Sequence, residues 1–143
     1  MNTETARRMM DAARASALEL DKGVSVAIVD AGGNLMCMER VNDAAPATTF
    51  IAEGKAVASV MMGRDSGKLA FMQENFPTIL DAVSARVGGR FLAVQGAAVV
   101  LQGKATEGAV GVSGSTVEND HTVADAGANA AQSGGGRGVT GKQ

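Results

Sequence analysis

The chain has 143 residues, with 13 Lys and Arg against 15 Asp and Glu, one His and one Cys. A globule of this length buries roughly 70% of its unfolded surface and rarely divides further, so we expect one principal domain. The slightly acidic balance disfavours nucleic acid as a partner, because binding phosphates requires a basic surface.

The single cysteine provides no disulfide framework and no Cys cluster for structural zinc. The amino terminus lacks the basic segment and apolar run of a signal peptide, and no stretch approaches the roughly 20 apolar residues of a membrane span. We therefore expect a cytoplasmic protein that does not associate with membranes. The chain has no Trp or Tyr and only four Phe, which predicts a core of small aliphatic side chains.

The amino-terminal half is predicted to contain two helices separated by a hairpin. Apolar residues recur at steps of three and four from Thr3 to Leu20, which is typical of an amphipathic helix. The β-branched run Val24–Asp30 and the segment Leu35–Arg40 flank a glycine-rich turn and predict a β-hairpin. The segment Thr48–Met62 carries apolar groups on every side, so we expect a helix covered on several sides by the core or by another subunit.

Two short helices are predicted next. Asp65 can cap a helix that runs to about Asn75, and Pro77 suits the first position of another helix that ends at Gly88 and Gly89.

The carboxy-terminal part is predicted to return to strands before a last helix. The apolar segments Phe91–Leu101 and Ala109–Val112 indicate up to three further strands, with Gly96 at a bulge or bend. The last helix is expected to begin near Thr116, whose hydroxyl can cap it, and to run to about Gln132. Residues 133–143 lack apolar periodicity and are expected to form a mobile tail.

The order of these elements joins neighbouring strands through short connections, which favours an α+β domain with an antiparallel sheet. No GxGxxG sequence follows the first strand and there is no P-loop, so a doubly wound nucleotide-binding fold is disfavoured. We assign residues 1–132 to the domain and residues 133–143 to a flexible Gly-rich tail.

Three segments together resemble one known family. They are VAIVDAGGNLMCMER at Val26–Arg40, IAEGKAVASVMMGR at Ile51–Arg64 and GAVGVSGSTVENDHTVADAGANA at Gly108–Ala130. On these segments the chain resembles the GlcG/HbpS-like family, which includes the carboxy-terminal domain of PduO-type proteins. The resemblance implies a profilin-like domain, with about five antiparallel strands flanked by helices, that assembles into symmetric homo-oligomers. It also implies haem binding or degradation, corrinoid metabolism, or a part in small-molecule catabolism.

The segment from Gly111 to Thr116 runs from a predicted strand into a helix start. Its amides, including that of Gly114, and the hydroxyls of Ser113 and Ser115 can converge on a carboxylate or phosphate. Ordinary capping with a tight turn explains the same residues equally well. A serine hydrolase is disfavoured, because Ser115 stands where the last glycine of a GxSxG motif would be.

The first turns of the last predicted helix carry Glu118, Asp120, His121 and Asp125. His121 and Asp125 are four residues apart, so their side chains can touch. One imidazole and one carboxylate can relay a proton or supply part of a metal shell, although a lone His on an exposed turn is more often solvated. Since the chain has no second His and no usable Cys, we expect no metal site.

Lys55 interrupts an otherwise apolar helix. Its ammonium group must reach water or meet a carboxylate, and the candidates are Glu53 of another copy, Asp30 and Glu39. A partly buried lysine can bind an anionic ligand or act as a base when its pKa is lowered. A structural ion pair at a subunit interface explains Lys55 as well.

Two functional hypotheses follow from these residues. In the first, Arg40, Lys55, the Ser113–Ser115 loop and His121 line a pocket near a subunit interface that binds haem or another anionic metabolite. Arg40 would present its planar guanidinium to a carboxylate or haem propionate, with Glu118 and Asp120 nearby. A Met or His121 could ligate haem iron, although haem pockets usually have aromatic walls that this chain scarcely provides.

In the second hypothesis the protein is a catabolic enzyme that acts on a small carboxylate. Lys55 or His121 would be the general acid or base, and the loop would donate to an oxyanion. The sequence leaves open whether the protein is an enzyme.

Overall fold

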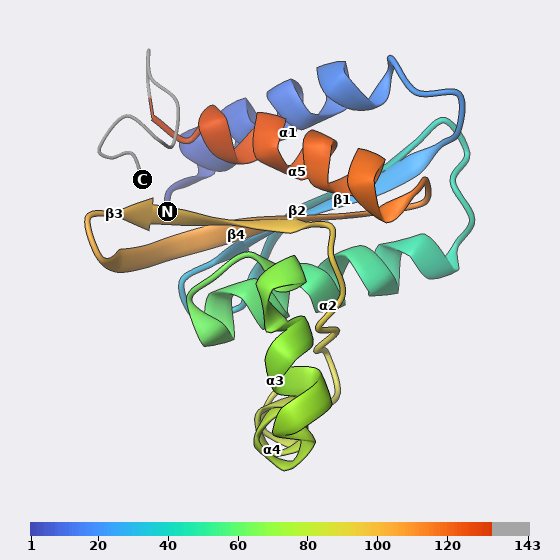
Figure 1. The fold of residues 1–143 in the computed structure, drawn as a ribbon. Helices are drawn as coiled ribbons and strands as arrows, with labels where there is room; N and C mark the ends of the chain where they lie inside the picture. Colours follow the sequence, from blue (N-terminus) through green and yellow to red (C-terminus); the bar gives the residue numbers. More distant parts are fainter. Residues whose placement is uncertain (133–143) are drawn as a thin grey trace.

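A four-stranded antiparallel sheet lies between two layers of helices in the computed structural model, which describes residues 1–132 (Figure 1). The predicted tail at residues 133–143 lies outside the described residues. The elements follow one another as α1 (Thr3–Ala17), β1 (Val24–Asp30), β2 (Leu35–Val41), α2 (Ala47–Met62), the 3₁₀ helix η1 (Ser66–Leu69), α3 (Ala70–Asn75), α4 (Pro77–Arg86), β3 (Ala97–Gln102), β4 (Ala105–Ser113) and α5 (Val117–Asn129).

The strands follow the order β2-β1-β4-β3, and every neighbouring pair is antiparallel. The predicted α+β class and the hairpin of β1 and β2 are therefore confirmed. The sheet of the described residues has four strands, close to the expected number of about five. Residues 91–96 form no strand, since the amide of Leu92 donates to the carbonyl oxygen of Gly54 in α2, at 3.0 Å, instead of to a strand.

The two faces of β1 support different layers of helices. Val24, Val26 and Ile28 are fully buried in a cluster with apolar residues of α1 and α5, whereas Val29 packs with residues of α2. This alternation follows from the two-residue period of a strand. Figure 1 shows the result, with α1 and α5 on one face of the sheet and α2 on the other.

Small residues let α2 approach the sheet closely. A Cβ atom on Gly111 in β4 would lie 2.0 Å from the carbonyl oxygen of Ala52 in α2, so only glycine fits there. The side of α2 that carries Ala58 packs instead against Leu69, Leu80 and Phe91. Most of the apolar surroundings predicted for this helix are thus supplied within one chain, whereas Phe50 near its start is 75% exposed.

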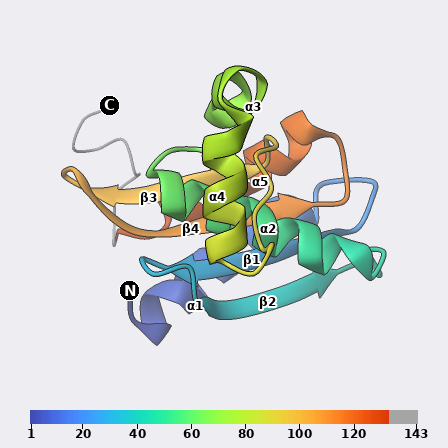
Figure 2. The ribbon, with the colours of Figure 1, turned by 90° about the horizontal axis from the view of Figure 1, so that it is seen from below.

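The segment that contains α3 and α4 extends from the α2 side of the sheet (Figures 1 and 2). Three large apolar side chains of this segment are at least half exposed, namely Phe71, Phe76 and Ile79. Among residues 1–132, no helix is both long enough and apolar enough to cross a membrane.

Candidate functional site

Lys55 and Asp120 form a buried ion pair. The Lys55 Nζ atom lies 3.4 Å from Asp120 Oδ2 and donates to the carbonyl oxygen of Val112 at 2.9 Å. Each side chain of the pair is only 3% exposed. Burial lowers the pKa of Lys55, and the Asp120 carboxylate acts in the opposite direction. Lys55 therefore meets a carboxylate, as expected, but its partner is Asp120 of the same chain and none of the three predicted candidates.

The loop before α5 binds the same carboxylate. The amide of Ser115 donates to Asp120 Oδ1 at 3.0 Å, so the chain's own Asp120 occupies the anion position that the loop predicts. The Thr116 hydroxyl caps α5 by accepting from the amide of Asn119, as predicted. Gly114 has a φ of 141°, and a Cβ atom there would lie 2.4 Å from the carbonyl oxygen of Gly23. This position therefore requires glycine.

The remaining candidates are distributed over the molecule. Ser113 is buried at the end of β4, opposite Ser25. Arg40 is exposed on β2, at the opposite edge of the sheet from β3, and Glu118 is exposed on the first turn of α5. The structure brings Lys55, Asp120 and the Ser115 amide together and keeps Arg40 apart from His121.

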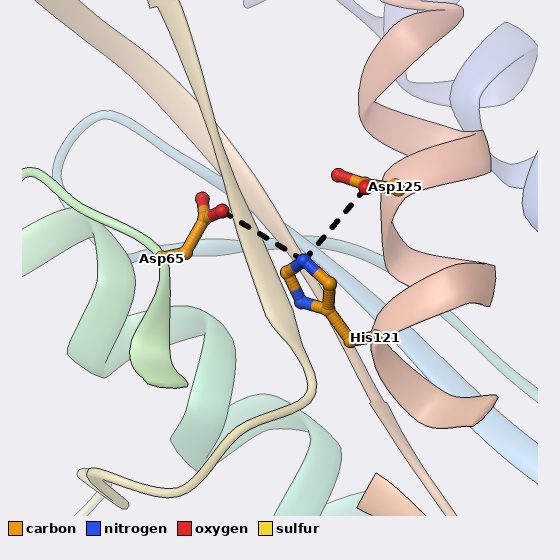
Figure 3. Close-up of side chains that lie close together, drawn as sticks. All are labelled: Asp65, His121 and Asp125. Carbon is orange, nitrogen blue, oxygen red and sulfur yellow. Dashed lines mark ion pairs between the residues drawn. The ribbon is translucent and has the colours of Figure 1, made fainter. Parts of the chain in front are cut away.

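A second polar cluster lies beside β3, the edge strand (Figure 3). The Nε2 atom of His121 is 3.7 Å from Asp125 Oδ2 and 3.8 Å from Asp65 Oδ2. Asp65 lies between α2 and η1, and its Oδ1 atom accepts from the amide of Val99 in β3 at 2.9 Å. We call Asp65, His121 and Asp125 the His121 cluster.

The sequence predicted only part of this cluster. The helical spacing of His121 and Asp125 does bring them together, as expected. Asp65 was predicted to cap a helix, but its side chain makes no capping hydrogen bond and binds the edge of the sheet instead. The sequence holds no local signal for this, because the docking of α2 against the sheet positions Asp65.

The His121 imidazole has a mixed environment. The side chain is 24% exposed, yet its Nδ1 atom is buried and has no hydrogen-bond partner within residues 1–132. The cluster is thus able to hold a proton or a cation between two carboxylates.

A groove of about 340 Å³ lies next to the amino-terminal half of α2. Its lining residues come from α2 and from the coil after α4, and they are Phe50, Ile51, Glu53, Gly54, Gly88, Gly89, Arg90, Phe91 and Leu92. Arg90 Nη1 lies 3.1 Å from both Glu53 Oε2 and the carbonyl oxygen of Gly33, which fixes the guanidinium at the groove. The sequence did not predict this groove, although the consecutive Gly88 and Gly89 ahead of Arg90 were a local signal.

Comparison with known proteins identifies the family. The family described as "Haem degrading protein HbpS-like" matches residues 1–129. A 15.0 kDa protein of the dhaT-dhaS intergenic region of Citrobacter freundii is 31% identical over 120 residues, which cover 84% of each chain.

Two solved structures are similar throughout. The crystal structure of HbpS is 29% identical, with a TM-score of 0.80, and the match covers 90% of this chain and 87% of that one. The complex of PduOC with haem is 25% identical, with a TM-score of 0.78, and the match covers 91% of this chain and 94% of that one. The chain belongs to the HbpS-like family of haem-degrading proteins.

Proposed function

We propose that this protein binds small ligands, and that it holds haem or another flat anionic metabolite in the groove beside Phe50 and Arg90. The observation that carries the proposal is the combination of an apolar wall and a guanidinium group in one groove. Ligand sites are typically apolar with a few well-placed polar groups. Membership of the HbpS-like family and the haem bound to PduOC support haem as the first ligand to test.

The groove residues fit the porphyrin part of haem. Phe50 is 75% exposed, so its ring can cover an apolar face of a ligand. Gly88 and Gly89 leave open space, since a Cβ atom on either would meet nothing within 4 Å. Arg90 Nη1 already donates to Glu53 and to the carbonyl oxygen of Gly33, so a propionate would be bound by the other N–H groups of the guanidinium.

The groove residues do not fit the iron. None of the nine lining residues carries the imidazole, thiolate, thioether or phenol group that ligates haem iron in proteins. His121 is not among them, and its Nε2 atom lies between two carboxylates. We therefore infer that the groove binds the apolar face and the carboxylate groups of a flat anionic ligand. The residues that line the groove would not ligate the iron of haem.

The enzymatic alternative has less support. Lys55 is buried and paired with Asp120, so it is not positioned to meet a substrate as a general base. His121 lies outside the groove lining.

The test compares haem with iron-free protoporphyrin, each titrated into the purified protein and followed by visible absorption. We expect both to bind with similar affinity and stoichiometry. Loss of a hydrogen bond to a charged group costs about 1.5 to 3 kcal/mol, so Arg90→Met should weaken both ligands by roughly tenfold or more. Phe50→Ala should weaken both as well.

Arg40→Met removes an exposed arginine outside the groove lining and serves as the matched control. Tight binding of haem alone, lost in His121→Ala, would contradict the groove and identify His121 as the iron ligand. Binding of neither compound would contradict the proposed ligand class.

We further propose that copies of the chain meet through α3 and form a homo-oligomer. The support is the pair of exposed rings Phe71 and Phe76, whose centroids lie 6.2 Å apart, because apolar patches on soluble proteins often mark contacts with other chains. The molar mass from light scattering should exceed that of one chain, and Phe71→Asp should lower it. A monomeric wild-type protein would contradict the proposed homo-oligomer and would not affect the test of ligand binding in the groove.

A further inference from the structure

We propose that Asp65, His121 and Asp125 bind a divalent first-row transition-metal cation at the outer edge of β3. The site would use one imidazole nitrogen and two carboxylate oxygens, together with ligands from solvent. This inference concerns residues outside the groove and does not rest on haem or on any other ligand proposed for it.

The spacing of the three side chains is close to that of ligands around one metal ion. All three ligand atoms lie within 4.8 Å of one another, and His121 Nε2 is 3.7 and 3.8 Å from the two carboxylate oxygens. These separations exceed the roughly 3.2 Å limit of a good N–H···O hydrogen bond. Metal bonds of roughly 2.0 to 2.2 Å at tetrahedral or octahedral angles separate neighbouring ligand atoms by about 2.8 to 3.6 Å. Shifts of a few tenths of an ångström would bring the two distances from His121 Nε2 into that range, and the two carboxylates would close on the metal by larger side-chain movements.

The contacts of the His121 imidazole also support a metal ion at Nε2. Within residues 1–132, Nδ1 is buried without a partner, and the nearest carboxylates lie beyond hydrogen-bond distance of Nε2. A metal bound at Nε2 would leave Nδ1 as it is, so the support comes from Nε2, which two carboxylate oxygens approach at 3.7 and 3.8 Å without reaching hydrogen-bond distance. Nε2 is the ring nitrogen that faces the carboxylates (Figure 3).

The surrounding structure positions the ligands. Asp65 Oδ1 accepts from the Val99 amide, which leaves Oδ2 directed at His121. His121 and Asp125 share one face of α5 because they are four residues apart. The donor atoms thus come from two separate parts of the chain, each held by secondary structure.

The donor set indicates the class of metal. Imidazole nitrogen suits Zn²⁺, Fe²⁺, Co²⁺, Ni²⁺ and Cu²⁺, and carboxylates also accept Mn²⁺, whereas Mg²⁺ and Ca²⁺ prefer all-oxygen sites. Two carboxylates and a neutral imidazole would neutralise a divalent cation. We therefore expect binding of Zn²⁺, Co²⁺ and Mn²⁺ in preference to Mg²⁺.

The experiment uses the fact that the chain contains one histidine. The ring signals of His121 are followed by NMR in protein made without a polyhistidine tag, during addition of Zn²⁺, Mn²⁺ or Mg²⁺. One equivalent of Zn²⁺ should shift these signals to saturation, substoichiometric Mn²⁺ should broaden them, and Mg²⁺ should leave them unchanged. Ring signals that stay unchanged on addition of every one of the three metals would overturn the proposal and leave the cluster as an ion-pair network.

Variants locate the metal. Even changes to the partners of metal ligands cost roughly 10- to 100-fold in affinity, so Asp125→Asn should raise the Kd for Zn²⁺ at least about tenfold. Asp65→Asn should do the same while its remaining carbonyl oxygen still accepts from Val99. Glu118→Gln changes an exposed carboxylate on the same helix and should leave the Kd unchanged. Equal Zn²⁺ affinity in all three variants would place the metal elsewhere and overturn the assignment.

Discussion

The ion pair between Lys55 and Asp120 joins the two helical layers through the end of the sheet. Lys55 belongs to α2 and Asp120 to α5, and these helices lie on opposite faces (Figure 1). Each of the two side chains is only 3% exposed, and Lys55 Nζ lies 3.4 Å from Asp120 Oδ2. The polar atoms of the pair are further satisfied by the Val112 carbonyl and the Ser115 amide. The pair thus links the two layers, and removal of either residue would leave the other charge buried without compensation.

Removing one partner should therefore be costly. Asp120→Asn keeps an acceptor for the Ser115 amide but leaves Lys55 without its counter-charge, and breaking a buried pair in this way costs about 3 to 5 kcal/mol. Lys55→Met should cost a similar amount. The measurement is the free energy of unfolding in urea for the wild type, both single variants and the double variant.

The double variant is the decisive one. It should lose less stability than the sum of the two single variants, because neither charge is then left unpaired. Additive losses would show that the two residues act independently. Glu118→Gln, at an exposed position of α5, should stay within about 0.5 kcal/mol of the wild type.

The spacing of apolar residues along the sequence predicted the helices and strands of this fold better than it predicted which of them contact one another. The apolar spacing of α1 and the alternation in β1 follow from the geometry of one helix and one strand, and both elements are present. The helix ends were less accurate, since α1 stops at Ala17 and α5 at Asn129, short of the predicted Leu20 and Gln132. The apolar residues after Arg90 predicted a strand that begins at Phe91. Phe91 instead lies in a coil and packs against Ala58 of α2.

The same distinction explains the candidate site. His121 and Asp125 were paired correctly because four residues make about one helical turn. Lys55 and Asp120 are 65 residues apart, and their meeting depends on how α2 and α5 dock across the sheet. Asp65 reaches His121 for the same reason. Periodicity contains no information about such docking.

A second prediction concerns the turn before α5. Gly114→Ala should destabilise the fold by more than about 3 kcal/mol, because strain and a backbone clash act together. Its Cβ atom would meet the Gly23 carbonyl oxygen at 2.4 Å, at a φ of 141°. Gly103→Ala is the matched control, since φ is 62° there and a Cβ atom meets nothing within 4 Å. At a non-glycine residue, the left-handed conformation alone lowers the stability of the fold by about 1 to 2 kcal/mol, which is the loss expected for Gly103→Ala. Equal losses in urea unfolding would contradict the role of the clash.

The third prediction concerns the single cysteine. Burial raises the pKa of the Cys37 thiol, and the Glu39 carboxylate acts in the same direction. Because the thiolate is the reactive form, Cys37 in the folded protein should react with a disulfide reagent at pH 8 several-fold more slowly than in urea. Glu39→Gln should increase the folded rate modestly. Equal rates for folded and unfolded protein would show that the thiol is not protected.

The last prediction concerns pH and the contact between α1 and β2. Arg14 Nη2 donates to Glu39 Oε2 at 2.7 Å, and Arg14 Nε donates to Oε1. The Arg14 hydrogen bonds hold the pKa of Glu39 below its ordinary value, against the opposing effect of burial. The charged form of Glu39 is thus favoured by folding. Its contribution is complete above the ordinary glutamate pKa of about 4.3 and is lost as the pH falls through the lower value in the folded state.

Because both side chains are more than a third exposed, the contribution should be small. Exposed ion pairs contribute at most about 1 kcal/mol, so Glu39→Gln should cost no more than that at pH 7. The difference in unfolding free energy between wild type and variant should persist at pH 5.5 and shrink toward pH 3, and 1 M salt should reduce it at neutral pH. Urea unfolding at these pH values measures it directly. A difference that grew as the pH fell would have the wrong sign for a carboxylate whose pKa is lowered by folding, and would show that Arg14 does not stabilise the charged form of Glu39.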